Sequence, residues 1–199
     1  MPPKPKYTKD EIITAAFELV RERGSDAMTA REVGKCLGVS SSPIFTSFRD
    51  MEELRVNVVA RARARFDEYI AVADGFKPAF KKRGMQWVKF AQEEPMLFRL
   101  LFMCDNASNT DLDTAIGIIP TGRVEDVDII MRDYAFTREQ AEHLFRQMWV
   151  YTYGLCSMCA AHVCRFEDEE ISNLLTDVFT GLVHVLKAPP AATGLPVEV

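Results

Sequence analysis

The chain has 199 residues, of which 48% are hydrophobic, and a formal net charge of −5. This length and apolar content fit one fair-sized folded core, or a small domain beside a larger one, and exclude an intrinsically disordered chain. No run of about 18 apolar residues occurs, and the basic N-terminus lacks the apolar region of a secretory signal, so we expect a cytoplasmic protein with no membrane partner.

Charge is distributed unevenly along the chain. Residues 1–50 carry eight Lys or Arg against seven acids, whereas residues 51–199 carry sixteen against twenty-two. The net acidic charge argues against general binding of polyanions. Any nucleic-acid-binding function is therefore expected in the front quarter of the chain.

Four motifs have the spacing of a helix capping box, in which one side chain accepts a backbone N–H and the residue three positions later reaches back. They are Thr8 with Glu11, Thr29 with Glu32, Asp50 with Glu53, and Thr137 with Gln140. Each precedes apolar residues at helical spacing, so we expect a helix after each of them.

The whole chain is predicted to be all-α, because no convincing strand alternation or hairpin signal occurs. The expected helices are Lys9–Arg23, Ala30–Leu37, one starting after Ser40 and ending near Phe48, Met51–Ala73, Pro78–Glu93, Pro95–Met103, Val124–Tyr134, Thr137–Cys164 and Asp168–Lys187. Residues 104–123 are predicted to form a loop with broken helical turns. We expect a three-helix domain at 1–54, a larger helical domain at 55–188 and a flexible tail at 189–199.

The segment Ala30–Arg49 has the features of a helix-turn-helix. Gly34 supplies the small residue that two steeply crossing helices require, and Gly38 tolerates the positive φ of a sharp reversal. Ser40 is a suitable N-cap for the second helix, and Pro43 falls in its first turn, where a missing N–H costs no hydrogen bond. An αα-corner without a ligand has the same features, so these residues alone leave both interpretations open.

The first 55 or so residues resemble the DNA-binding domain of the TetR/AcrR-type transcriptional regulators. The stretches that carry the resemblance are TKDEIITAAFELVRERG and MTAREVGKCLGVSSSPIFTSFRDMEEL. A further stretch, GMQWVKFAQEEPMLFRLLFM, is similar to part of the ligand-binding domain of several members. The resemblance implies a homodimer that binds a near-palindromic operator in double-stranded DNA and responds to a small-molecule effector of unknown identity. We expect a repressor that an apolar or amphipathic ligand releases.

The chain departs from the family pattern at three positions of this domain, at two of which the family has a Tyr or Lys that commonly contacts DNA phosphates. Phe45, Ser47 and Met51 occupy positions where the family usually has Tyr, His and Lys. We therefore expect bases to be read by serine and threonine hydroxyls and by Pro43 against thymine methyls. The residues expected to contact DNA are Lys4, Lys6, Lys9, Thr29, Arg31, Ser40, Ser41, Ser42, Pro43, Phe45, Thr46 and Arg49. The missing donors leave an alternative open, in which the fold has lost DNA binding and serves as a small-molecule-binding or interaction protein.

The family resemblance also implies a ligand pocket in the larger domain and a dimer interface on the last two helices. The candidate ligand-binding residues are Phe90, Phe102, Met103, Met131, Trp149 and Tyr153. Apolar and aromatic residues are equally typical of plain core packing, which is the competing interpretation for each of them.

Two further kinds of site are not expected. The segment CSMCAAHVC, Cys156–Cys164, has the residue types of a zinc site, but on a helix these side chains do not converge. We expect buried thiols there and no metal or cofactor. The sequence has no Ser-His-Asp grouping, H-E-x-x-H, P-loop or dinucleotide fingerprint, so we do not expect an enzyme.

Overall fold

The computed structural model describes residues 7–103, 111–118 and 123–188. In these ranges the chain is helical and forms no strand, which confirms the all-α prediction. The elements are α1 (Lys9–Arg23), the 3-10 helix η1 (Ser25–Ala27), α2 (Ala30–Cys36), α3 (Ser42–Ser47), α4 (Met51–Ala71), α5 (Ala79–Glu93), α6 (Pro95–Phe102), α7 (Leu112–Ile118), α8 (Arg123–Tyr134), α9 (Arg138–Ala160) and α10 (Asp168–Lys187). None of the helices in these ranges combines the length and hydrophobicity needed to cross a membrane.

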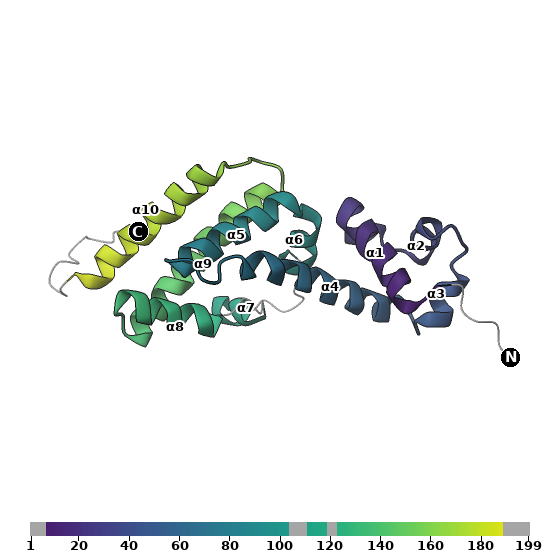
Figure 1. The fold of residues 1–199 in the computed structure, drawn as a ribbon, viewed down its shortest axis with the longest axis horizontal. Coiled ribbons are helices and arrows are strands. Elements are labelled where there is room, and N and C mark those ends of the chain that lie inside the picture. Colours follow the sequence, from purple (N-terminus) through teal and green to yellow (C-terminus); the bar gives the residue numbers. More distant parts are fainter. Residues whose placement is uncertain (1–6, 104–110, 119–122, 189–199) are drawn as a thin grey trace.

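Helices α1 to α3 form a small head at one end of the molecule, and α5 to α10 form a larger body (Figure 1). The head packs around Ile12, Val33 and Ile44, which are fully buried. A Cβ on Gly34 would lie 3.0 Å from the carbonyl oxygens of Val39 and Ser40, so α2 and the turn after it approach each other at glycine distance. The α2–α3 turn therefore has the helix-turn-helix geometry predicted for it.

Helix α4 belongs to both parts of the molecule, and Figure 1 shows it leading from the head into the body. Near its start, Leu54 and Val58 are buried, and further along Phe66 and Tyr69 are buried. Their side chains belong to one hydrophobic core that runs from the head into the body. The boundary predicted between residues 54 and 55 falls inside this helix.

The capping boxes predicted at Thr8 and Thr137 are complete. At Thr29 and Asp50 the side chain accepts the expected backbone N–H, but the return bond was predicted wrongly. The two glutamates bind other donors instead: Glu32 pairs with Arg23 and Lys35, and Glu53 pairs with Lys9 and accepts the backbone N–H of Arg49. Both glutamates accept from charged side chains, whose hydrogen bonds are stronger than neutral ones, and Glu53 accepts in addition from a backbone N–H one residue before the N-cap.

Most predicted helix ends lie within two residues of those in the structure, and the differences at the start of α3 and the end of α9 have a local cause. The N-cap of α3 is Ser41 and not Ser40, and its side chain makes no capping bond. The reason lies in the turn, where the N–H of Val39 still bonds to the carbonyl of Gly34 and the helix begins one residue before Pro43. Helix α9 ends at Ala160 rather than Cys164, because the chain reverses at His162 with a φ of 57°.

The segment predicted as a loop, 104–123, contains helix α7. Residues 104–110 and 119–122 of that segment, and the predicted tail 189–199, lie outside the described residues.

Candidate functional site

The outer surface of α3 carries no charge. Ser42, Phe45 and Thr46 are exposed on this helix, whereas Ile44 and Phe48 on its other side are buried in the head. Phe45 is 52% exposed, which is high for an aromatic side chain. The Thr46 hydroxyl donates to the carbonyl of Ser42 at 3.1 Å, so its methyl group is fixed in direction. This surface can make hydrogen bonds and apolar contacts but no ion pair.

The basic residues of the head differ in whether their charge is paired with an acidic side chain. Arg31 is exposed in the first turn of α2 and makes no ion pair with any residue in the described ranges. Arg49 is 81% exposed in its side chain, and its one ion pair with a described residue is with its neighbour Asp50, at 3.0 Å. Lys9 is bound at 2.9 Å by Glu53, and it also lies over the Phe48 ring. Arg31 is therefore available to an external anion, while Lys9 joins α1 to α4.

The structure brings most of the expected DNA-contacting residues together at the head. Eight of them are exposed or half-exposed at the start of α2, on the α2–α3 turn or on α3: Thr29, Arg31, Ser40, Ser41, Ser42, Pro43, Phe45 and Thr46. Lys4 and Lys6 lie outside the described residues. One supporting residue had no signal in the sequence: Tyr7 donates its hydroxyl to the carbonyl of Leu37 at 2.7 Å and so ties the segment before α1 to the end of α2.

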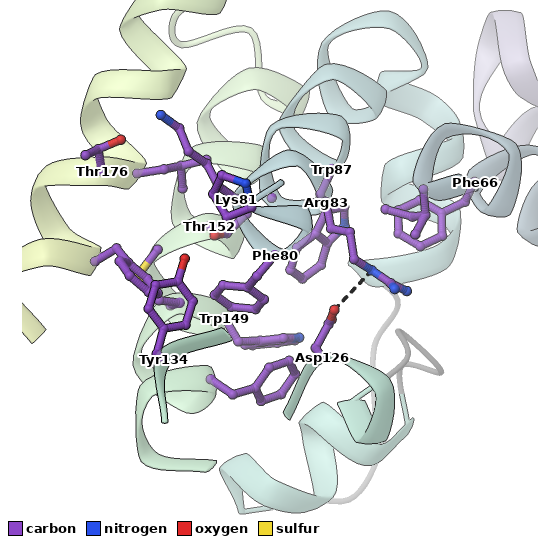
Figure 2. A pocket seen from close by; sticks show the side chains of 17 residues that line it. Phe66, Phe80, Lys81, Arg83, Trp87, Asp126, Tyr134, Trp149, Thr152 and Thr176 are labelled. Carbon is purple, nitrogen blue, oxygen red and sulfur yellow. Dashed lines mark ion pairs between the residues drawn. The ribbon is translucent and has the colours of Figure 1, made fainter. Parts of the chain in front are cut away.

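The body contains a cavity of about 300 Å³, lined from α4, α5, α8, α9 and α10 and by Pro78 just before α5. This volume lies at the lower end of the range found for small-molecule sites. The aromatic side chains of the lining are Phe66, Phe80, Trp87, Tyr134, Phe145, Trp149 and Phe179, most of which are labelled in Figure 2. A cavity with such walls favours an apolar, ring-containing occupant.

One part of the cavity wall is polar. The side chains of Arg83 and Asp126 face each other there, with Nε 3.0 Å from Oδ1 (Figure 2). The N–H of Arg83 is not aligned with that oxygen, so the contact is ionic and Oδ1 has no hydrogen-bond donor among the described residues. The indole N–H groups of Trp87 and Trp149 are also buried without an acceptor in the same part of the chain. Burial raises the pKa of Asp126 to about 7; the charge of Arg83 opposes this rise and that of Glu125 adds to it.

Replacing Asp126 with asparagine should change how stability depends on pH. Because the folded pKa of Asp126, about 7, lies above the ordinary 3.8, its contribution is fully present below pH 3.8 and is lost as pH rises through 7. Asparagine does not titrate, so between about pH 5 and pH 8 the wild type should lose about 2–3 kcal/mol relative to Asp126→Asn. Urea unfolding at both pH values measures this loss.

The matched control is Asp128→Asn, because Asp128 lies on the same helix with its side chain 57% exposed. Its unfolding free energy should differ from that of the wild type by the same amount at both pH values. Parallel pH profiles for Asp126→Asn and the wild type would contradict the assignment of a costly buried charge to Asp126.

Of the six residues expected at a ligand site, Trp149 alone lines this cavity. The others lie elsewhere: Phe90 and Phe102 are buried in the aromatic cluster around Phe66, Met131 is half-buried against the core, Met103 is 44% exposed after α6, and Tyr153 stacks on Trp149 and donates to the carbonyl of Phe102. No local pattern marks Asp126 as a lining residue, because its burial comes from the packing of α8 against α5 and α9.

The cysteines of the segment Cys156–Cys164 are not gathered into a site. Cys156 and Cys159 are buried on α9, and the thiol of Cys159 lies 3.7 Å from the side-chain oxygen of Gln92. Burial raises the pKa of both thiols, that of Cys159 to about 11. Within the described ranges, no group of three or more His, Cys, Asp or Glu side chains could hold a metal ion.

Comparison with known proteins places the head in a family. Residues 12–58, from α1 into α4, match the family model described as bacterial regulatory proteins, tetR family. No curated protein matches the chain.

Solved structures resemble the chain over most of its length. A TetR-like transcriptional regulator from Rhodococcus sp. RHA1 is 14% identical, with a TM-score of 0.62, and the match covers 86% of this chain and 93% of that one. A TetR-family regulator from Mesorhizobium loti MAFF303099 is 16% identical, with a TM-score of 0.58 and coverage of 92% and 98%. The fatty acid degradation regulator FadR from Bacillus halodurans is 18% identical, with a TM-score of 0.59 and coverage of 92% and 97%.

These identities are low, so the solved structures establish the fold, while the family model adds a sequence match for the head. Both the model and the named structures are of transcriptional regulators and not of enzymes. The chain therefore has the N-terminal domain and the overall fold of the TetR family of transcriptional regulators.

Proposed function

We propose that the protein is a repressor that binds a near-palindromic operator in double-stranded DNA as a homodimer. We further propose that it leaves the operator when a small apolar or amphipathic molecule enters the body cavity. The observation that carries the first part is the exposed, uncharged face of α3 in a head whose sequence matches the family model. A helix at this place in a helix-turn-helix enters the major groove.

In this proposal bases are read by neutral groups. The hydroxyl of Ser42 can donate to or accept from base edges, and the Thr46 methyl and the Phe45 ring can contact thymine methyls. We assign the phosphate contacts to Arg31, to Arg49 and to the hydroxyl of Thr29, which are exposed in the head. Such contacts position a protein on DNA without reading its sequence.

Selection of bound duplexes from a random library tests DNA binding directly. We expect one enriched near-palindromic sequence, and we expect Thr46→Glu to weaken binding to it at least about tenfold, because a carboxylate would face the groove. Gel shifts at fixed salt measure the change. Val124→Glu is the control, because it adds the same charge at a position that is 64% exposed on α8, outside the proposed dimer surface, and should leave affinity within about twofold. A selection that enriches nothing would instead favour the alternative, a TetR-like fold that has lost DNA binding and acts as a small-molecule-binding or interaction protein.

Replacing Arg31 with alanine should weaken binding to every duplex to a similar extent. One lost phosphate contact should lower the slope of log affinity against log salt by about 0.9. Arg132→Ala is the control, since Arg132 is 69% exposed on α8 in the body. A slope that Arg31→Ala leaves unchanged would remove Arg31 from the proposed phosphate contacts.

Exposed apolar side chains on the last two helices support the homodimer. Val150 and Met158 on α9 and Val185 on α10 are exposed in the single chain. A second copy could cover these side chains, and a homodimer that binds a near-palindromic site must place its two heads on successive major grooves, about 34 Å apart along the DNA.

The proposed release of DNA depends on α4. Phe66 on this helix lines the cavity, and Leu54 near its start is buried in the core that continues into the head. A ligand that binds one orientation of α4 better than another shifts the population of head positions. Only the orientation that matches the groove spacing binds the operator.

A further inference from the structure

Three buried polar atoms of the cavity wall have no hydrogen-bond partner in the described part of the chain. They are Oδ1 of Asp126 and the indole nitrogens of Trp87 and Trp149. The three residues are between 7% and 8% exposed, and all of them line the cavity. One atom requires a donor and two require an acceptor, and each unpaired buried group costs about 1–3 kcal/mol.

The charge at this end of the cavity is already balanced. Arg83 Nε lies 3.0 Å from Asp126 Oδ1, so a buried cation and a buried anion face each other. Beside this pair, a charged group of the ligand would add one uncompensated charge, which costs several kcal/mol. Lys81 also lines the cavity and could pair with an anion, but the end of the cavity at Arg83 and Asp126 favours a neutral group.

A hydroxyl group is the smallest neutral group that supplies both missing partners. The hydroxyl can donate a hydrogen bond to a carboxylate oxygen while one of its lone pairs accepts a hydrogen bond from an indole N–H. Figure 2 shows the nitrogen end of the Trp149 ring on the side of Asp126 in this view, and both residues line the cavity. The rest of the wall presents aromatic faces and edges, against which another ring packs well.

We propose that the effector is a neutral aromatic alcohol or phenol whose hydroxyl donates to Asp126 and accepts from the Trp149 indole. This inference rests on the proposed function, because it takes the cavity as the effector site. Trp87 supplies a second indole N–H at the wall, and Arg83 keeps the carboxylate charge balanced. The aromatic ring of the ligand occupies the space between the aromatic side chains.

Four probes that differ in one substituent test the ligand class: 4-tert-butylphenol, tert-butylbenzene, 4-tert-butylbenzoate and 4-tert-butylbenzylamine. Calorimetric titration gives each affinity. The chain has two tryptophans and both line the cavity, so tryptophan fluorescence gives an independent measurement at the site. Titrations are run at about pH 8, because the pKa of Asp126 is raised to about 7 and the carboxylate is then mostly ionised.

The expected result is that the phenol binds at least about tenfold more tightly than each of the other three probes. Trp149→Phe keeps an aromatic ring but removes the indole N–H, and it should reduce the preference for phenol over tert-butylbenzene to about twofold or less. Asp126→Asn should also reduce the preference for the phenol over tert-butylbenzene. Urea unfolding shows whether each variant is folded. Thr176→Val is the control, because it removes a lining hydroxyl from α10, away from Asp126, and should leave the preference unchanged.

Several results would overturn the inference. Tightest binding of the benzoate or of the benzylamine would make the ligand an acid or a cation. Equal affinities for the phenol and tert-butylbenzene, or no binding of any probe, would remove the role of the hydroxyl. Operator release is measured separately by gel shift, so a phenol that binds without releasing DNA contradicts the proposed function and leaves the ligand class intact.

Discussion

Replacing Phe66 with alanine is expected to lower the free energy of unfolding by about 3–5 kcal/mol. Phe66 is 2% exposed and lies at the centre of an aromatic cluster, with its ring centroid 5.1 Å from those of Phe90 and Phe102 and 6.5 Å from that of Trp87. The substitution removes these edge-to-face contacts. It also enlarges the cavity that Phe66 lines, and a larger void costs more.

Urea unfolding at one pH measures this loss, with Phe76→Ala as the matched control. Phe76 is 51% exposed in the segment between α4 and α5, so the same chemical change should cost no more than about 0.5 kcal/mol there. The loss of unfolding free energy for Phe66→Leu should lie between the losses for Phe66→Ala and Phe76→Ala, because leucine keeps most of the buried volume. Equal losses for Phe66→Ala and Phe76→Ala would show that the aromatic cluster contributes little to stability.

Glu94→Gln is expected to lower the free energy of unfolding by about 2–3 kcal/mol and to loosen the head on the body. Glu94 lies between α5 and α6, and its side chain is 2% exposed. Arg21 of α1 donates to both of its oxygens, at 2.6 and 2.7 Å, and Arg65 of α4 lies 3.3 Å away. This pairing raises the pKa of Arg21. One buried carboxylate therefore holds a helix of the head and the helix that joins head and body.

The size of this effect follows from what the substitution leaves behind. An amide is neutral and cannot offset two guanidinium charges, but the arginine side chains are 40% and 39% exposed and can turn to water. The cost therefore lies below that of a fully enclosed pair. Glu68→Gln is the control, because Glu68 binds the same Arg65 while 65% exposed, and it should cost less than about 0.5 kcal/mol.

Urea unfolding measures both Glu94→Gln and Glu68→Gln, and a double-mutant cycle with Arg21→Gln separates the contribution of the Arg21 pair. A coupling energy near zero would mean that Glu94 does not hold the head through Arg21.

The elements that sequence predicts well are those with local signals. Thr8 and Thr137 begin helices because their capping boxes involve residues only three positions apart, and Gly34 and Gly38 mark the turn by backbone geometry. The pairs between residues far apart in the sequence have no such local signal. Glu94 meets Arg21 across 73 residues of sequence, and Arg83 meets Asp126 only because α8 packs on α5.

The predicted ligand residues show the same limit. Aromatic content correctly indicates an apolar, ring-lined interior, but sequence cannot say which rings face the void. Phe90 is fully buried beside Phe66, whereas Trp149 is at the wall. The difference depends on how five helices pack, and no spacing within one helix encodes it.

The length of α4 between the cavity and the head determines how far the head would move in the proposed release. From Phe66 to Leu54 the helix rises about 18 Å, at about 1.5 Å per residue. If α4 tilts by about 5° at the cavity, a point about 18 Å away along the helix moves sideways by about 1.5 Å, and the head moves with it. Hydrogen bonds to base edges weaken within a few tenths of an ångström, so in the proposed release a rotation too small to disturb the packing of the body would be enough to shift the head out of register with the groove.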